Sequence, residues 1–581
     1  MKKKNLTQLV PAEKIVLFLT AITLIVTPVF AENPPPGSEP GAQGQRVYNQ
    51  FERRKAALGK KKVETPKIEV EKKKEAPVPA GVTFLLKEVK ISGSTVFKSE
   101  DLKPLYQPYL DKKVSFQDLD EITKKIEDQY VQKGYLTATA YIPEQDIKDG
   151  KVELKVVEGR VGKVTVEGNK WFSSALIKKF LHLKKNEPLN IPKLQKDILR
   201  LNQNPDLEVK TLLQAGEVAG TTDIVLRATD HFPYHVGVGE DNQGTRLTGK
   251  YRTSFHLRSS NLTGHADYLF VSNILSANTE GASAGYSLPV DTHGTSIGMD
   301  VTYFNMTLGK ELRTYHITGV TQIYDPHISK ELYLTEDFQA NTTVGMEIKV
   351  IKKEVAGKVT TNDQLRLPYL GFNFTKSDAF GGGGETNFSP RFTFGTSHFL
   401  GASTRDHPSA SRDKTGGFFF NYQQNLSRLQ KMFWQSYIAV RSFFQGSPYT
   451  LPSSEQCQLG GINSVRGYPE GDYLADIGGS ISTDWMFPAY FIPEHWKLPG
   501  ADTPLRRQIE PFIFTDVGLG MLNKVLPGER EHKFLMGMGG GVQFHFQKNF
   551  SVRVQWAKPM GDQPAGGGGP STFYLTCQAE I

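Results

Sequence analysis

The chain has 581 residues, a length that allows several domains. Its formal net charge is +8, which is too dilute over this length to indicate a nucleic-acid-binding protein. The thirteen histidines and two cysteines show no spacing typical of metal ligands. We therefore expect neither a metal site nor a nucleic-acid partner.

Residues 1–31 have the features of a secretory signal. Several lysines precede an apolar run from Ile15 to Phe30, and the run ends at Ala31, a small residue suited to signal peptidase. A membrane-anchoring helix is the alternative. The run of about sixteen residues is shorter than the roughly twenty that span a bilayer, and Pro28 interrupts it. The pattern favours export of the mature chain.

Residues 32–80 form a predicted tether. Prolines open it, and a stretch rich in Lys, Glu and Pro closes it. Between them Val47, Phe51 and Leu58 recur at helical spacing, which indicates a short amphipathic helix. Composition alone favours disorder instead. A helix over 43–60 would be about 27 Å long, close to the roughly 25 Å apolar band of an outer-membrane barrel.

Two units of similar predicted design follow, at 81–159 and 160–230. Each has the order β-α-α-β-β over about 75 residues, so the sequence contains an internal repeat. Such a unit can form one small sheet covered on one face by two helices. The expected elements are strand 82–91, helices 97–110 and 116–133 and strands 135–142 and 151–157, then strand 161–166, helices 173–183 and 191–202 and strands 207–214 and 222–228.

From about residue 231 to 581, helical periodicity gives way to alternation of apolar and polar residues, as from Ser296 to Tyr303. The apolar side carries aromatic residues, and the polar side carries Gln, Asn, Arg or Asp. This favours an outer-membrane barrel over a soluble sandwich, which would also alternate. At roughly twenty residues per strand and connection, about sixteen antiparallel strands fit, enough to enclose a channel. The expected fold class is mainly β, a barrel preceded by two small α+β domains.

One long connection in the expected barrel, residues 457–479, contains Val465, Arg466, Gly467 and Tyr468, and the run Phe514-Thr515-Asp516-Val517-Gly518 lies in a candidate strand downstream. These motifs resemble the signature of the POTRA-barrel transporter superfamily. With two POTRA-like units, a helix and a linker ahead of the barrel, the chain resembles the two-partner secretion transporters of the haemolysin and filamentous-haemagglutinin secretion type. One departure is the C-terminus, Ala579-Glu580-Ile581, where outer-membrane barrels usually end on an aromatic residue.

The resemblance implies that the long connection folds into the barrel lumen, that Arg466 at its tip meets an acidic residue of the wall, and that the N-terminal helix plugs the lumen. Physical reasoning supports the pair, because a guanidinium inside a barrel needs a carboxylate. Asp516 shares strand parity with Gly518 and can face the lumen, so Asp516, with Phe514 and Gly518 beside it, is the expected wall partner. The alternative places Arg466 on a solvated outer loop, where it contributes almost nothing.

The resemblance also implies an outer-membrane location, periplasmic POTRA domains, and export of a large β-helical adhesin or cytolysin. We call this exported protein the client. The outer-membrane lipids and periplasmic chaperones are further expected partners. We find no clustered acid, base or nucleophile and no phosphate-binding loop, so neither an enzyme nor a cofactor is expected. Client capture by strand addition to a POTRA sheet edge would need no nucleotide. Assembly of other barrels is the alternative function, and a passive pore or barrel enzyme fits less well.

The two cysteines, Cys457 and Cys577, could pair in an exported chain. Cys577 shares strand parity with Phe573 and Leu575, which predicts a lipid-facing position. This favours free thiols.

Overall fold

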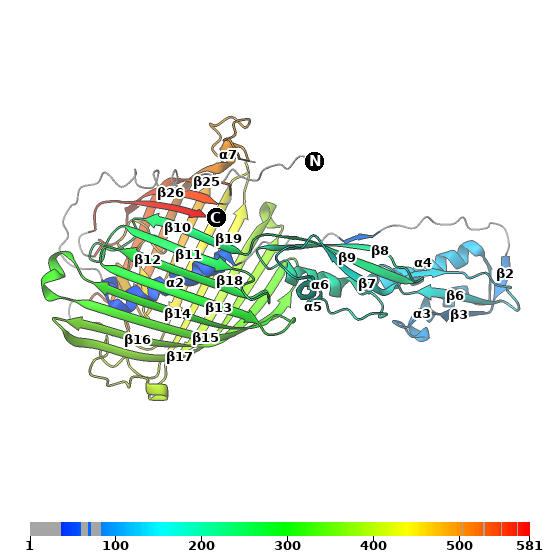
Figure 1. The fold of residues 1–581 in the computed structure, drawn as a ribbon, viewed down its shortest axis with the longest axis horizontal. Coiled ribbons are helices and arrows are strands. Elements are labelled where there is room, and N and C mark those ends of the chain that lie inside the picture. Colours follow the sequence, from blue (N-terminus) through cyan, green and yellow to red (C-terminus); the bar gives the residue numbers. More distant parts are fainter. Residues whose placement is uncertain are drawn as a thin grey trace.

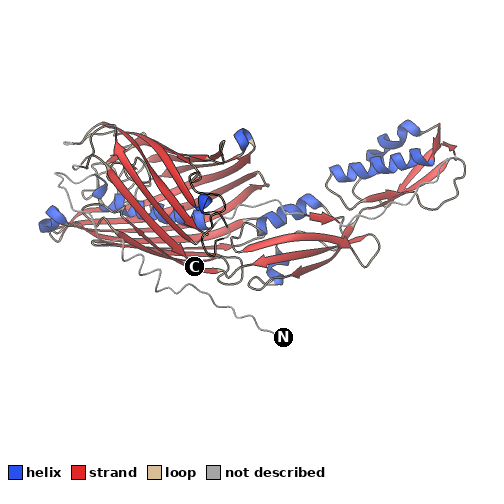
Figure 2. Cartoon of the chain, turned by 90° about the horizontal axis from the view of Figure 1, so that it is seen from above, coloured by secondary structure: helices blue, strands red, loops and turns tan. Residues whose placement is uncertain are grey.

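The computed structural model describes residues 36–59, 68–70, 83–501, 503–526, 529–547, 549–565 and 568–581. The expected signal at 1–31 and the tether residues 32–35, 60–67 and 71–80 lie outside these residues. The described chain forms a large barrel, with two small α+β units arranged in a row from one of its mouths (Figures 1 and 2). We call the mouth beside these units the near mouth and the opposite one the far mouth.

The first unit packs helices against a three-stranded sheet of order β3-β6-β5. Leu119, Ile122, Ile126 and Tyr130 of the longer helix are fully buried, because they recur on one face of it. The elements are β2 (Thr83–Leu86), β3 (Glu88–Ser92), α3 (Ser99–Tyr106), β4 (Lys112–Ser115), α4 (Phe116–Gln132), β5 (Thr139–Tyr141) and β6 (Lys151–Val157), with a 3-10 turn at Gln107–Tyr109.

The single strand predicted at 82–91 is wrong. The chain bends at Lys87, whose main-chain N–H donates to the carbonyl of Gly150 at 2.8 Å. Strand β2 therefore leaves the main sheet and pairs with β4, an antiparallel strand that the sequence did not reveal. Both strands have only four residues, too few for a clear alternating pattern.

The second unit comprises β7 (Arg160–Glu167), α5 (Ser174–Lys179), α6 (Ile191–Leu201), β8 (Leu207–Ala215) and β9 (Thr221–Asp230). Helix α5 ends four residues before the predicted end at 183, and the His182 N–H donates to Asp197 at 2.7 Å instead of continuing the helix. The sheet has a further strand that we did not predict, β1 (Ile68–Val70), which pairs in parallel with β8. Three residues of the expected linker thus occupy a sheet edge of this unit.

Sixteen antiparallel strands close into a barrel through pairing of β10 with β27, which confirms the expected fold class. They are β10 (Tyr234–Asp241), β11 (Arg252–Ser259), β12 (Tyr268–Ser276), β13 (Thr279–Pro289), β14 (Thr295–Thr307), β15 (Thr318–Leu334), β16 (Phe338–Val355), β17 (Lys358–Asp378), β18 (Gly384–Phe394), β19 (Phe420–Lys431), β20 (Tyr437–Gly446), β23 (Ile477–Met486), β24 (Ile509–Met521), β25 (His532–Phe546), β26 (Phe550–Pro559) and β27 (Thr572–Glu580).

Alternation along the strands separates an apolar outer face from a polar inner face. On β14, Met299 and Tyr303 are 40% and 41% exposed on the outside, whereas Asp300 and Thr302 are buried inside. No helix in the described part of the chain combines the length and apolarity needed to cross a membrane.

Polar contacts fix the second unit to the near mouth. Arg200 of α6 forms a two-bonded ion pair with Glu331 of β15, at 2.6 and 3.2 Å. Asp206 accepts hydrogen bonds from His235 of β10 and from Ser260, which follows β11. Strand β10 therefore begins at this mouth, and the antiparallel order then places every second connection at the far mouth.

Both cysteines are free and buried. Cys577 lies on the same side of β27 as the exposed Phe573, as its parity predicts, but its side chain is only 5% exposed, against 52% for Phe573. Its small side chain lies in a pairing position between Val552 of β26 and Glu240 of β10.

Candidate functional site

The connection between β20 and β23 leaves the far mouth and folds back into the lumen. It spans residues 447–476, whereas the predicted range was 457–479. The connection therefore begins ten residues earlier than predicted, and Gly478 and Gly479 belong to β23. Within it β21 (Cys457–Leu459) and β22 (Tyr473–Ala475) form a small antiparallel sheet. We call this segment the lumen loop. The residues that follow β21 carry the predicted motif, and Val465, Arg466 and Tyr468 are each at most 1% exposed.

Arg466 lies against the wall residue expected from the sequence. Its Nε and Nη2 donate to the two carboxylate oxygens of Asp516 on β24, each at 2.6 Å. Its main-chain N–H also donates to Asp516 Oδ2 at 2.9 Å. This two-bonded geometry matches the planar guanidinium, and both side chains are almost fully buried.

A second carboxylate, which sequence reasoning missed, completes the site. Arg466 Nη2 lies 2.5 Å from Asp484 of β23, and Asp484 also accepts from Arg441 at 3.0 Å and from Arg553 at 2.9 Å. Two buried carboxylates thus meet three guanidinium groups. The only sequence signal was the polar parity of Ser480, Ser482 and Asp484 on the strand after the loop. Without the strand register, that parity could not place Asp484 beside Asp516.

The aromatic member of the expected motif supports the guanidinium from one face. The Phe514 ring centroid lies 3.5 Å from Arg466 Cζ, a stacked cation–π arrangement. Arg553 stacks in the same way on Phe512, at 4.2 Å. The arginine cluster also borders a cavity of about 430 Å³, so part of the site opens to solvent-filled lumen.

Glycines let the loop backbone approach the wall. A Cβ at Gly518 would lie 2.7 Å from Val465, and a Cβ at Gly537 of β25 would lie 2.0 Å from the Arg466 carbonyl oxygen. Gly467 adopts φ +97°, which a residue with a side chain rarely tolerates. Gly518 therefore acts in the site through its missing side chain.

Tyr468 anchors the other side of the tip. Its hydroxyl accepts from the Gly561 N–H at 3.0 Å, and the Tyr574 hydroxyl accepts from the Gly467 N–H at 3.0 Å. The structure thus brings together all seven residues expected at this site: Val465, Arg466, Gly467, Tyr468, Phe514, Asp516 and Gly518. Their role in transport stays a prediction.

A helix is the second occupant of the lumen. Helix α2 (Pro40–Leu58) lies inside the barrel against β12 to β16 (Figures 1 and 2). Tyr48 donates to Asp325 at 2.7 Å, and the Lys55 ammonium bonds both oxygens of Asp300 at 2.6 Å. The helix is three residues longer at its start than predicted. The sequence left both a helix and disorder open for this part of the tether, and the structure shows the helix.

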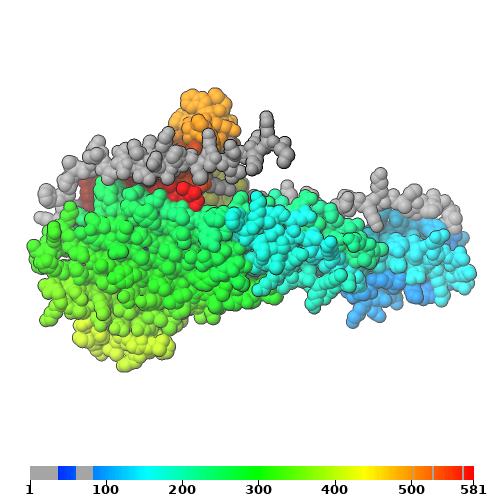
Figure 3. Space-filling view, viewed as in Figure 1, coloured from blue at the N-terminus to red at the C-terminus, as the bar shows by residue number. Residues whose placement is uncertain are grey.

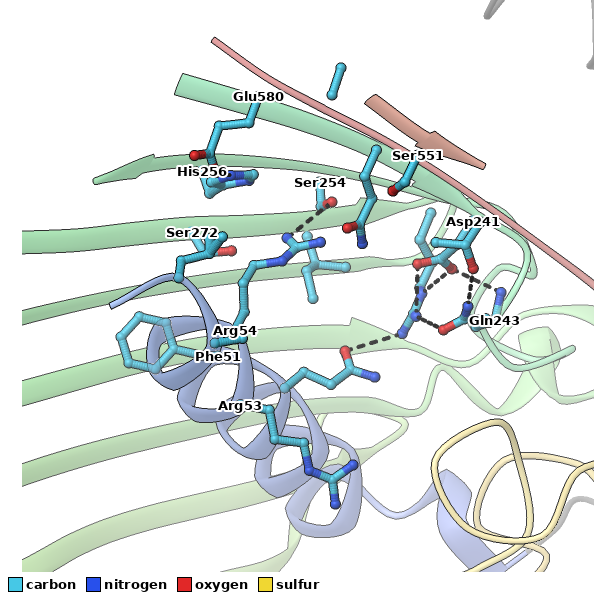
Figure 4. Close-up of a pocket in the computed structure, with 18 of the residues that line it drawn as sticks. Phe51, Arg53, Arg54, Asp241, Gln243, Ser254, His256, Ser272, Ser551 and Glu580 are labelled. Atoms are coloured by element: carbon cyan, nitrogen blue, oxygen red, sulfur yellow. Dashed lines mark hydrogen bonds and ion pairs between the residues drawn. The ribbon is translucent and has the colours of Figure 1, made fainter. Parts of the chain in front are cut away.

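The packing around the helix is incomplete on one side. A cavity of about 540 Å³ lies beside it, and Figure 4 shows Arg53, Arg54 and Phe51 of the helix among its lining residues. Arg54 donates to Ser254 at a long 3.4 Å. This side of the helix contacts the wall through long polar side chains, which water can replace.

The helix and the lumen loop touch each other. Arg46 Nη2 donates to Gln458 at 2.7 Å, and the Gln458 amide donates back to the Ala42 carbonyl at 2.6 Å. The Gly37 N–H bonds the Gly471 carbonyl at 2.9 Å.

One group of described residues has the spacing of metal ligands, although the sequence predicted no metal site. Asp300, Asp325 and His327 offer ligand atoms within 4.8 Å of one another. The Lys55 ammonium already neutralises Asp300, so these side chains serve to bind the helix.

Comparison with known proteins agrees with this architecture. Residues 84–159 match the POTRA domain of ShlB type, and residues 220–544 match the family described as haemolysin secretion/activation protein ShlB/FhaC/HecB. The heme/hemopexin transporter protein HuxB of Haemophilus influenzae is 25% identical over 500 residues, covering 83% of this chain and 84% of that protein.

The outer membrane transporter CdiB of Dickeya dadantii is 23% identical over 444 residues, covering 73% of this chain and 76% of that protein. The solved structure of CdiB from Escherichia coli has a TM-score of 0.70 at 21% identity and covers 95% of this chain and 100% of that chain, which shows the shared fold. Because the second family match spans more than half of the sequence, the chain belongs to the ShlB/FhaC/HecB family of haemolysin secretion/activation proteins, outer-membrane transporters of two-partner secretion with periplasmic POTRA domains.

Proposed function

We propose that this transporter captures one unfolded exoprotein in the periplasm through its POTRA units and exports it through the barrel without nucleotide hydrolysis. The observation that carries the proposal is the state of the lumen. A sixteen-stranded barrel is wide enough for a channel, and here the lumen holds two elements, α2 and the lumen loop, bound largely by polar contacts. Such elements can move aside without unfolding the wall.

In this proposal, the POTRA units capture the client at a sheet edge. Strand β8 has one edge that already accepts an added strand, because β1 pairs with it in parallel. An extended client segment replacing β1 would gain the same main-chain hydrogen bonds without a demanding sequence requirement. Gln214, exposed near the end of β8, is a suitable position for a photoreactive crosslinker.

In this proposal Arg466 and Asp516 hold the lumen loop in its resting position, and α2 closes the remaining channel. The family description, haemolysin secretion/activation protein, supports a secreted protein as the client. We infer that the client is a large secreted protein with an extended region recognised by the POTRA units, and that periplasmic chaperones keep it unfolded.

The deciding experiment compares the proteins outside cells that carry or lack this chain, by quantitative mass spectrometry, and measures the barrels of the outer membrane in the same cells. Export of one partner predicts the loss of one large protein from the medium or cell surface, with membrane barrels unchanged. Broad loss of other outer-membrane barrels would instead identify the chain as an assembly factor. No change in either fraction would contradict both functions.

A further inference from the structure

One connection at the near mouth differs from its neighbours. Residues 487–508 join β23 to β24 with 22 residues, whereas residues 335–337 join β15 to β16 with three. The long connection is folded, since Ile492 is buried, the Leu505 N–H bonds the Trp496 carbonyl at 2.8 Å, and α7 (Leu505–Gln508) closes it. Figure 3 shows it in orange as a projection from the side of the barrel, well apart from the POTRA units.

This projection exposes aromatic side chains. Phe491 is 78% exposed, Trp496 54% and Tyr490 43%. Three large aromatic side chains exposed on one short segment indicate an interaction surface. The surface is independent of the lumen and of the POTRA sheet edges, and the proposed function does not use it.

The aromatic group continues a belt on the outer wall of the barrel. At the neighbouring near-mouth turn, the Phe433 ring lies 4.8 Å from Trp434 and 6.1 Å from Trp485, and Trp485 lies 4.8 Å from Phe487. Trp434 is 74% exposed. Tryptophan and tyrosine rings gather where a barrel leaves the hydrocarbon and enters the headgroup layer. The projection begins at Phe487, at the end of this belt.

Cationic side chains lie among the exposed rings. The Arg506 guanidinium carbon is 4.6 Å from the Tyr490 ring centroid. Arg507 and Glu494 form a 3.8 Å ion pair and are both more than half exposed, so this pair is weak and open to exchange. Arginine beside aromatic rings suits a layer that offers phosphate groups above an apolar boundary.

We propose that residues 487–508 form a membrane-interface anchor, whose aromatic side chains enter the headgroup layer of the phospholipid leaflet that faces the POTRA units. The occupant of this surface is phospholipid, because the surface continues the lipid-facing belt and carries arginines. The anchor would hold one side of the near mouth at a fixed depth in the leaflet.

Spin labelling tests this inference. Cys457 and Cys577 are replaced by serine, and single cysteines are introduced by Phe491→Cys, or by Leu136→Cys in the first POTRA unit as a matched control that is 44% exposed. Both proteins are reconstituted into vesicles of phosphatidylethanolamine and phosphatidylglycerol, with the quenchers present on both sides. The accessibility of each nitroxide to apolar oxygen and to a water-soluble nickel chelate is then measured.

We expect the label at 491 to collide more with oxygen than with the chelate, and the label at 136 to show the reverse order. Heat-modifiable migration on gels verifies that each barrel is folded. Equal, water-like accessibility at the two positions would overturn the inference. So would dipolar broadening between labels at 491 on different molecules, which would identify a second copy of the chain as the occupant.

In the same background, Arg506→Gln with Arg507→Gln should reduce the oxygen preference at 491 when phosphatidylglycerol is present, and should have less effect in purely zwitterionic vesicles. An equal effect in both lipid mixtures would contradict a role of these arginines toward lipid phosphate.

Discussion

The lumen loop and helix α2 fill the same barrel but are bound in different ways. The loop is joined to the wall at both ends, and its backbone lies against glycines of β24 and β25. The helix is not part of the barrel sheet, and its polar contacts run mainly through side chains such as Lys55 and Tyr48. From this difference we expect the helix to be displaced from the lumen more easily than the loop.

Burial alone does not separate the two elements. Arg466 is 1% exposed in the loop, and Tyr48 is 2% exposed in the helix. The distinction lies in the contacts around each element. Arg53 and Arg54 of the helix border a cavity of about 540 Å³, whereas Arg466 bonds two buried carboxylates, Asp516 and Asp484, and its backbone lies against the wall.

The largest effect should follow Arg466→Ala. Removing one partner of a buried ion pair costs about 3 to 5 kcal/mol, reduced here because the cluster borders an open cavity. Even about 1.4 kcal/mol would shift a two-state loop tenfold. We expect loss of client export, together with roughly tenfold faster maleimide labelling of the buried Cys457 in a Cys577→Ser background.

The control for that experiment is Arg466→Lys, which keeps the charge but cannot bond both oxygens of Asp516 in one plane. Its labelling rate should fall between those of the wild type and the alanine variant. Heat-modifiability should show a folded barrel in all three proteins. Full export with unchanged labelling in Arg466→Ala would contradict the role of the ion pair. It would favour the alternative in which Arg466 contributes almost nothing.

A smaller effect should follow Gly537→Ala, which tests the glycine contact without changing a charge. The new methyl group would meet the Arg466 carbonyl oxygen at 2.0 Å, so the loop backbone must shift. Overpacking of this kind costs about 1 to 3 kcal/mol. We expect faster Cys457 labelling than in the wild type and slower labelling than in Arg466→Ala.

Gly540→Ala on the same strand is the matched control. Its nearest contact is the Phe512 carbonyl at 3.0 Å, and no lumen-loop atom lies among its close contacts. It should label like the wild type. Equal acceleration in both glycine variants would mean that the strand, and not the contact with the loop, is perturbed.

The smallest effect on the lumen loop should come from deleting residues 36–59. Removal of the helix should raise single-channel conductance in planar bilayers, because a sixteen-stranded lumen then opens beside the loop. Cys457 labelling should rise less than in Arg466→Ala, since the deletion removes the helix contacts of Gln458 but leaves the Arg466 cluster in place. Unchanged conductance would show that the helix is no plug, and labelling as fast as in Arg466→Ala would show that it holds the loop.

Much of the fold follows from local patterns. The strand alternation around Met299 and Asp300 predicts both faces of the barrel, because side chains alternate with period two. The Leu119, Ile122 and Ile126 stripe predicts α4. Strand β1 escapes prediction because three residues in a tract rich in Lys, Glu and Pro carry no periodicity. Strand β1 forms only because it pairs with β8, whose partner residue Thr211 lies 143 residues after Ile68.

The functional site was predictable only in part. Arg466 and Asp516 could be paired by motif and parity, since both properties are local. Asp484 could not be assigned, because its contact with Arg466 depends on the register of β23 against β24, where Ser482 faces Asp516. The register depends on the pairing of all the strands in the barrel, so it cannot be inferred from the sequence of one strand.

The position of α2 has a consequence for biogenesis. The partners of the helix come much later in the chain, up to Glu470, 424 residues after Arg46. The N-terminal end of the helix bonds Lys353 near the far mouth, whereas Gly59 lies beside Tyr268 at the near mouth. The helix therefore lies in the lumen with its N-terminal end at the far mouth. The strands that it contacts, β12 to β16, are synthesised after it, so the helix can make these contacts only once that part of the wall has formed.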